Sequence, residues 1–177
     1  MGRAVMKAVN NTNRGFTLVE TLLYMAILGT ILTALFSFAS VSYQARIKSQ
    51  TVAEVEQQGN QIMDIILQSI RSASLINTPT AQNSGASLSI NTYSGSTTPT
   101  VFDISGGNLR ITEGVNTPIN LTGGRVTISG LTFTNTSELN APGSVRVQFN
   151  LKYNNNSTAN EYDYNETFYG TASLRWP

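Results

Sequence analysis

The stretch Arg14-Gly15-Phe16-Thr17-Leu18-Val19-Glu20 joins a basic leader to a long apolar run. Residues 1–15 are polar and carry Arg3, Lys7 and Arg14 but no acidic residue. Residues 21–45 hold no charged side chain and are dominated by Leu, Ile, Ala, Phe and Val. At ~1.5 Å per helical residue, such a run can cross a hydrocarbon core of ~30 Å. The sequence therefore predicts one membrane-spanning helix at residues 16–45.

Composition excludes several classes of function. The 177 residues suffice for one modest domain and an extended element, and charged residues make up only 12% of them. Ser, Thr, Asn and Gly crowd the second half, which is typical of an exported surface protein. The net charge of +1 provides no field for collecting nucleic acid. Because the chain has no Cys and no His, disulfides, common zinc ligands and histidine catalysis are excluded. We expect neither an enzyme nor a cofactor.

Two ordinary explanations of the apolar run are a cleaved secretory signal and a plain signal anchor. A secretory signal fits poorly, because its apolar region is normally only ~7 to 15 residues long. An anchor fits better, since a basic leader before an apolar helix predicts an N-terminus in the cytoplasm and a C-terminal domain outside. Neither explanation accounts for an acidic residue, Glu20, at the start of the run.

Glu20 needs either a partner or a function. An ionisable side chain costs on the order of 2.5 to 3.5 kcal/mol at the centre of a membrane helix, and somewhat less near its end. If the chain is cut between Gly15 and Phe16, the new α-amino group of Phe16 is a cation at a depth close to that of Glu20. Two subunits could then pair amine to carboxylate.

The run from Arg14 to Glu20 resembles the class III signal of type IV prepilins and type II secretion pseudopilins. Both have a short basic leader, a Gly before the cut, an aromatic first mature residue and Glu as the fifth. The resemblance implies that prepilin peptidase cuts after Gly15, that Phe16 becomes the N-methylated terminus, and that Glu20 guides docking onto the subunit ahead. Gly29 falls where many family helices loosen on assembly, although a small residue for close helix packing explains it equally well. Unlike many major pilins, the chain has no Pro before Pro79.

The resemblance implies a structural subunit, a pilin or pseudopilin, that begins as a single-pass precursor in the cytoplasmic membrane. Its final place would be an extracellular or periplasmic filament. The implied partners are the membrane, prepilin peptidase, the assembly platform and other pilin subunits. The segment Ile70-Arg71-Ser72-Ala73, followed by a strand-rich head, is similar to J-type and W-type minor subunits. The alternative is a membrane-anchored adhesin or binding module that does not polymerise, and detection of peptidase cleavage separates the two.

Residues 46–76 should continue the helix in amphipathic form. Apolar side chains recur there at intervals of three, four or seven, with Gly59 in register: Val52, Val55, Ile62, Ile66 and Ala73. This half should pack on its own head, whereas the first half bundles with other subunits. The stripe is short for a coiled coil, which is the alternative. The helix should end near Ile76, ahead of Pro79.

Residues 77–177 predict a β-rich head, so the fold class is α+β, with the long helix packed on a mostly antiparallel sheet. Alternating apolar pairs separated by Gly-rich turns indicate hairpins: Leu88 and Ile90, Phe102 and Ile104, Leu109 and Ile111, Ile119 and Leu121. The alternation changes parity at Gly130, which predicts a bulge. The cleanest strand runs from Val145 to Tyr153, and a last strand from Phe168 to Trp176.

The head contains no convincing chemical site. Ser nucleophiles lack a histidine base, and Lys152 stands among alternating strand residues where a solvated position is the default. Glu161, Asp163 and Glu166 are oxygen ligands suited to calcium but lack the spacing of a known calcium loop, so a solvated connection is the alternative. Four tyrosines could form an adhesive patch or cover a sheet edge: Tyr153, Tyr162, Tyr164 and Tyr169.

Overall fold

The computed structural model describes residues 15–138, 142–155 and 159–175, and its elements are one helix followed by short and long strands. The helix and strands are α1 (Leu18–Arg71), β1 (Ala73–Thr78), β2 (Ser84–Gly85), β3 (Leu88–Thr92), β4 (Thr100–Ser105), β5 (Asn108–Glu113), β6 (Ile119–Asn120), β7 (Val126–Asn135), β8 (Ser144–Tyr153) and β9 (Asn165–Ser173). Two 3-10 turns, η1 (Gly95–Thr97) and η2 (Asn160–Tyr162), complete the order. The predicted α+β class is confirmed.

The chain forms two compact units that divide between Tyr43 and Gln44, inside α1. The first unit contains residues 18–43 of the helix, in which every side chain except that of Glu20 is exposed. The second contains residues 44–71 of the helix together with all the strands. The amphipathic part of the helix therefore belongs to the head.

The end of the helix corrects one expectation. Helix α1 ends at Arg71 and not near Ile76, because residues 73–78 form β1. This strand pairs antiparallel with β3, and Ile76 lies opposite Ile90. Pairing with β3 gives the backbone of this Ser-, Thr- and Asn-containing segment regular partners, and these residue types favour a helix only weakly.

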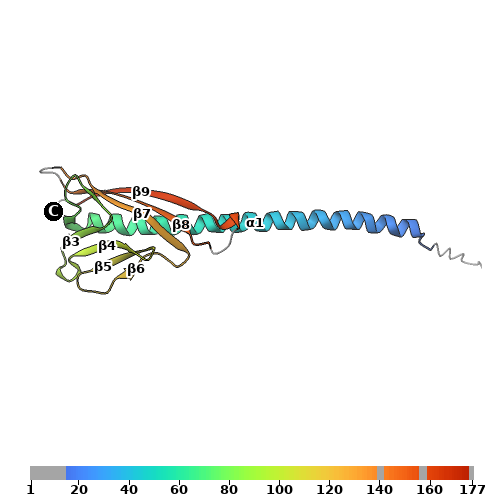
Figure 1. Cartoon of the computed structure of the whole chain (residues 1–177), viewed down its shortest axis with the longest axis horizontal. Helices are drawn as coiled ribbons and strands as arrows, with labels where there is room; N and C mark the ends of the chain where they lie inside the picture. Colours follow the sequence, from blue (N-terminus) through green and yellow to red (C-terminus); the bar gives the residue numbers. More distant parts are fainter. Residues whose placement is uncertain (1–14, 139–141, 156–158, 176–177) are drawn as a thin grey trace, which may run out of the picture. The chain divides into compact units, whose positions relative to one another are not determined.

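The strands form two antiparallel sheets where we expected one. The first has the order β1-β3-β4-β5-β6 and the second the order β2-β7-β8-β9. Figure 1 shows β7, β8 and β9 together and β3 to β6 as a separate group. The Ile128 N–H donates to the Gly107 carbonyl at 2.9 Å, which joins β7 to the turn between β4 and β5.

The bulge predicted in β7 is confirmed at Gly130. The pairing of β7 with β8 shifts register between Ser129 and Thr132. Gly130 has a φ of 62°, a left-handed conformation that glycine adopts without steric cost. The bulge explains how Ile128 and Phe133, which differ in parity, both reach the core.

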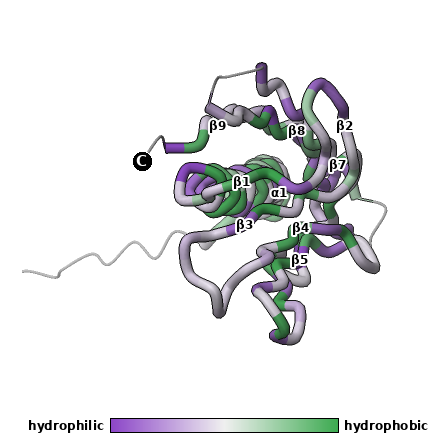
Figure 2. The backbone as a smooth tube through the Cα atoms, turned by 90° about the vertical axis from the view of Figure 1, so that its left-hand side faces the viewer, coloured by the Kyte–Doolittle hydropathy of each residue, from purple (hydrophilic) through white to green (hydrophobic). Residues whose placement is uncertain are grey.

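The core of the head lies between the second half of α1 and the sheets. The helix buries one stripe, made of Thr51, Val55, Gly59, Ile62, Met63, Ile66 and Ile70. In Figure 2 this half is seen nearly end-on, with β8 and β9 on one side and β3, β4 and β5 on the other. Most of the predicted stripe is confirmed, but Val52 is only half-buried and Ala73 is buried from β1.

Two glycines let the helix approach β9 closely. A Cβ atom at Gly59 would overlap the ring of Phe168, and one at Gly170 would overlap the Met63 sulfur. The aromatic ring and the long thioether thus fill the space that the glycines leave. Strand β9 ends at Ser173, and Trp176, which we expected in this strand, lies outside the described residues.

Candidate processing and assembly site

Local sequence positions the start of α1. Gly15, Phe16 and Thr17 precede the helix, and the Thr17 hydroxyl accepts the backbone N–H of Glu20 at 3.3 Å. The Thr17 carbonyl accepts the N–H of Thr21 at 3.1 Å. Thr followed three residues later by Glu is a helix-starting pattern, because the hydroxyl satisfies an amide that has no partner within the helix. Glu20 therefore lies in the first helical turn, where a negative charge is favourable.

A third residue, Tyr24, completes the site around Glu20. Its hydroxyl donates to Glu20 Oε1 at 3.1 Å. Its ring meets the ring of Phe16 edge to face, with the centroids 6.1 Å apart and the planes at 75°. Sequence reasoning missed Tyr24, although the interval of four residues from Glu20 to Tyr24 was visible and puts both on one helix face.

The helix after this site is suited to hydrocarbon. Large apolar side chains remain exposed along it, including Leu22, Leu28, Leu35, Phe36 and Val41. By length and composition α1 could cross a membrane. Its hydroxyls turn inward: Thr30 donates to the Ile27 carbonyl, Thr33 to Gly29 and Ser37 to Thr33, at 2.8 to 3.0 Å. Backbone acceptors thus satisfy these polar groups without water.

Gly29 is helical in this structure and lies on a face of small side chains. That face is a shallow groove lined by Met25, Ala26, Gly29, Thr30, Thr33, Ala34 and Ser37. A Cβ atom at Gly29 would meet no atom within 4 Å. Within the part of the chain that the structure describes, no contact therefore requires a glycine at this position.

Comparison with known protein families supports the class of protein that the residues from Arg14 to Glu20 indicate. Residues 10–36 match the family model described as "Prokaryotic N-terminal methylation motif", a span that includes Gly15, Phe16, Glu20 and Gly29. The comparison with curated proteins and the comparison with solved structures each returned no match. The motif and the long apolar helix together support a type IV pilin or pseudopilin with a class III signal, and this signature points to a structural protein. The class also implies association with other pilin subunits and a membrane-anchored precursor.

The calcium candidates are not gathered into one site. Asp163 forms an ion pair with Lys152 at 3.3 Å, and Glu166 accepts the Tyr164 hydroxyl at 3.2 Å. Glu161 lies in the short turn η2. Among the residues that the structure describes, no three acidic side chains stand together in a way that could hold a metal ion.

The four tyrosines do not form one patch. Tyr153 and Tyr162 stack with their centroids 6.1 Å apart, and Lys48 stands over the Tyr164 ring at 5.5 Å. Tyr169 is exposed on β9, opposite Gln148 of β8.

Burial, and then the hydrogen bond to Glu166, raises the pKa of the Tyr164 phenol. Lys48 lies over the Tyr164 ring and also donates to the Asp163 carbonyl at 2.7 Å. These two contacts attach the β8–β9 connection to the helix.

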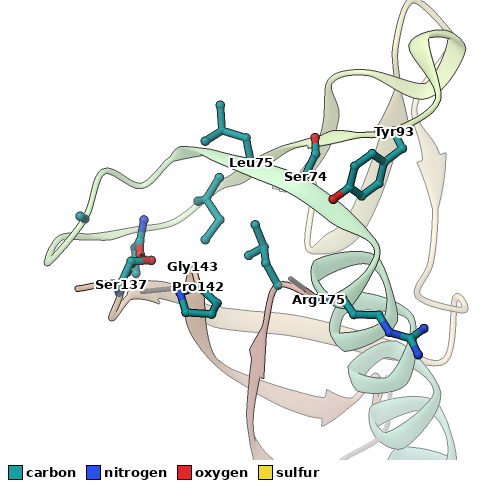
Figure 3. Close-up of a pocket in the computed structure, with 11 residues that line it drawn as sticks. Ser74, Leu75, Tyr93, Ser137, Pro142, Gly143 and Arg175 are labelled. Carbon is teal, nitrogen blue, oxygen red and sulfur yellow. Dashed lines mark hydrogen bonds between the residues drawn. The ribbon is translucent and has the colours of Figure 1, made fainter. Parts of the chain in front are cut away.

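A cavity of about 490 Å³ lies beside β1 in the head (Figure 3). Leu75, Ile76 and Leu174 form its apolar wall. Its polar wall is engaged internally: Asn135 Nδ2 donates to the Pro79 carbonyl at 2.7 Å, and its Oδ1 accepts the Ser137 N–H at 3.0 Å. None of the described residues that line it is acidic, so the cavity offers no acid–base pair.

Proposed function

We propose that this chain is a prepilin that prepilin peptidase cuts after Gly15 and that joins a pilus or pseudopilus through its apolar helix. The observation that carries the proposal is the combination of Glu20 in the first helical turn with exposed apolar side chains along residues 18–43. Exposed apolar side chains in such number require a bilayer or other protein around them. A filament core provides the second of these environments after the membrane has provided the first.

Cleavage would create a positive charge with which the Glu20 carboxylate of another subunit can pair. Cutting the peptide bond between Gly15 and Phe16 frees an α-amino cation four residues before Glu20. In an apolar core, an unpaired carboxylate is costly, whereas an ion pair with a neighbour's amine offsets much of that cost. Pairing between subunits therefore favours the assembled filament over separate subunits that stay in the membrane. Of the leader, residues 1–15, only Gly15 lies within the described residues.

The helix transfers from lipid to filament with little change in its apolar surroundings. Helix association in such surroundings depends on close packing, and small residues at the contact permit it. The groove at Gly29 is a suitable contact face, because all the residues that line it except Met25 are small. Gly29 therefore fits close packing between subunits, and its loosening on assembly remains a prediction.

The head supplies the outer surface of the filament in this proposal. Its helix half is attached by Lys48, by Gln58, whose Oε1 accepts the Gly123 N–H at 2.9 Å, and by the buried stripe. A minor rather than major role is the finer form of the proposal and rests on the similarity of residues 70–73 to J-type and W-type subunits. Quantitative mass spectrometry of filaments tests it, since a minor subunit is far less abundant than the major one.

Mass spectrometry of the mature N-terminus tests the proposal directly. Subunits purified from sheared filaments should begin at Phe16 and carry an added methyl group on the α-nitrogen. A protein that retains Met1 to Gly15 in the membrane and is absent from filaments would overturn the proposal. That result would instead favour a membrane-anchored adhesin.

A further inference from the structure

The Glu20 carboxylate has a partner in its own chain. The Tyr24 hydroxyl donates to Oε1 at 3.1 Å, one helical turn away. The nearby Thr21 hydroxyl is directed elsewhere, because it donates to the Leu18 carbonyl at 2.8 Å. Among the side chains that the structure describes, Tyr24 is the one that donates to the Glu20 carboxylate.

The contacts of Tyr24 extend to the residue that follows the proposed cut. The phenol ring of Tyr24 also meets the Phe16 ring at 6.1 Å, so one residue touches both the first mature residue and the carboxylate. A carboxylate has two oxygens and room for several hydrogen bonds. Oε1 is engaged by Tyr24, and no other side chain that the structure describes donates to Glu20, so Oε2 can accept from a donor that approaches from outside the helix.

We propose that Tyr24 is a positioning residue for assembly: it holds Glu20 Oε1 so that Oε2 faces the Phe16 amine of an incoming second copy. This inference rests on the proposed function. It implies that the carboxylate is ordered before the second copy arrives, which lowers the entropy lost on pairing. It also implies that the Tyr24 hydroxyl acts only through Glu20.

A competition assay tests the inference. Tagged Tyr24→Phe, Glu20→Ala and the double variant are each expressed with untagged wild-type subunits, so that even a poor competitor stays measurable in filaments. The tagged share in sheared filaments is divided by the processed tagged subunit in membranes. Tyr43→Phe is the matched control, because it removes a hydroxyl from the same helix far from Glu20.

Tyr24→Phe should lower the ratio by about fivefold, the effect of one net hydrogen bond on an equilibrium. The double variant should equal Glu20→Ala alone, and Tyr43→Phe should equal wild type. A merely structural role of Tyr24 would instead add its loss to that of Glu20→Ala. Normal cleavage of Tyr24→Phe would show that the variant is inserted.

Two results would overturn the inference while leaving the proposed function intact. One is wild-type incorporation of Tyr24→Phe while Glu20→Ala is poorly incorporated. The other is a further loss in the double variant, which would show that Tyr24 acts apart from Glu20. If Glu20→Ala itself competes as well as wild type, the subunit pairing is wrong, and the role of Tyr24 falls with it.

Discussion

Residues 18–43 and residues 44–71 belong to one helix, yet apolar side chains have opposite environments in its two halves. Phe36 in the first half is 74% exposed, whereas Val55 in the second is fully buried. Even a polar residue, Thr51, is buried in the second half. Hydrophobicity alone therefore does not decide burial within this chain. The apolar side chains of the first half can be buried only by lipid or another protein, whereas those of the second half are buried against the head.

The largest expected effect is a block of processing by a substitution at Gly15, just before the first half of the helix, with no change in the folding of the head. Gly15→Val should leave full-length precursor in the membrane, because the peptidase must accept the backbone closely and a branched side chain would obstruct it. An immunoblot measures the change. Thermal unfolding of the head should match wild type, and normal processing of this variant would count against the prepilin assignment.

Two phenylalanines test the contrast between the halves. Phe149 is fully buried and stacks on Phe168 at 5.4 Å, so Phe149→Ala should cost about 3 to 5 kcal/mol of head stability. Phe36→Ala should change it by less than about 0.5 kcal/mol. Near-UV circular dichroism of both variants in detergent measures unfolding. Equal losses would mean that the first half also supports the head.

Alanine substitutions at two helical glycines should have a smaller effect on head stability, and only one of them should lower it. Alanine favours a helix over glycine by about 1 kcal/mol. At Gly59 the new methyl group would overlap the Phe168 ring, so Gly59→Ala should nevertheless destabilise the head by about 1 to 3 kcal/mol. At Gly29 the space is open, and Gly29→Ala should not lower head stability. The same unfolding measurement decides, and a stabilising Gly59→Ala would disprove the close approach of α1 to β9.

The smallest effect is a pH dependence where the second half of the helix meets β9. Burial raises the pKa of Tyr164 above its ordinary value of 10.0, so the folded head holds this proton more tightly than the unfolded chain does. The associated stability is present below pH 10 and is lost as the pH rises through the raised pKa. The melting temperature should fall less steeply above pH 10 in Tyr164→Phe than in wild type. Tyr169→Phe controls for the loss of one phenol. Identical dependences of melting temperature on pH in wild type and Tyr164→Phe would contradict the raised pKa of Tyr164.

Local patterns made part of the structure predictable. The apolar run and the residues around Glu20 are contiguous in sequence, so the membrane segment and the methylation motif could be recognised without a fold. The parity change at Gly130 likewise has a local cause, since one extra residue in a strand reverses which side chains face inward. These features depend on neighbours in the sequence.

Non-local pairing made the rest unpredictable. The helix ends at Arg71 because residues 73–78 pair with β3, and their own sequence does not reveal that partner. The division into two sheets depends on which strands find each other across the chain. The burial of Thr51 follows from its place on the helix stripe and not from its polarity. The role proposed for Tyr24 could be inferred only after its contact with Glu20 was observed.

The central claim is that Glu20 pairs with the Phe16 amine of another subunit, and the distribution of processed subunit tests it most directly. Wild type, Glu20→Ala and the control Glu56→Ala, which removes an exposed carboxylate from the second half of α1, are expressed equally. Processed subunit is then measured in sheared filaments and in membranes. The account predicts that all three are cleaved, that Glu56→Ala enters filaments normally, and that Glu20→Ala accumulates in membranes. Entry of Glu20→Ala into filaments at the wild-type level would contradict it.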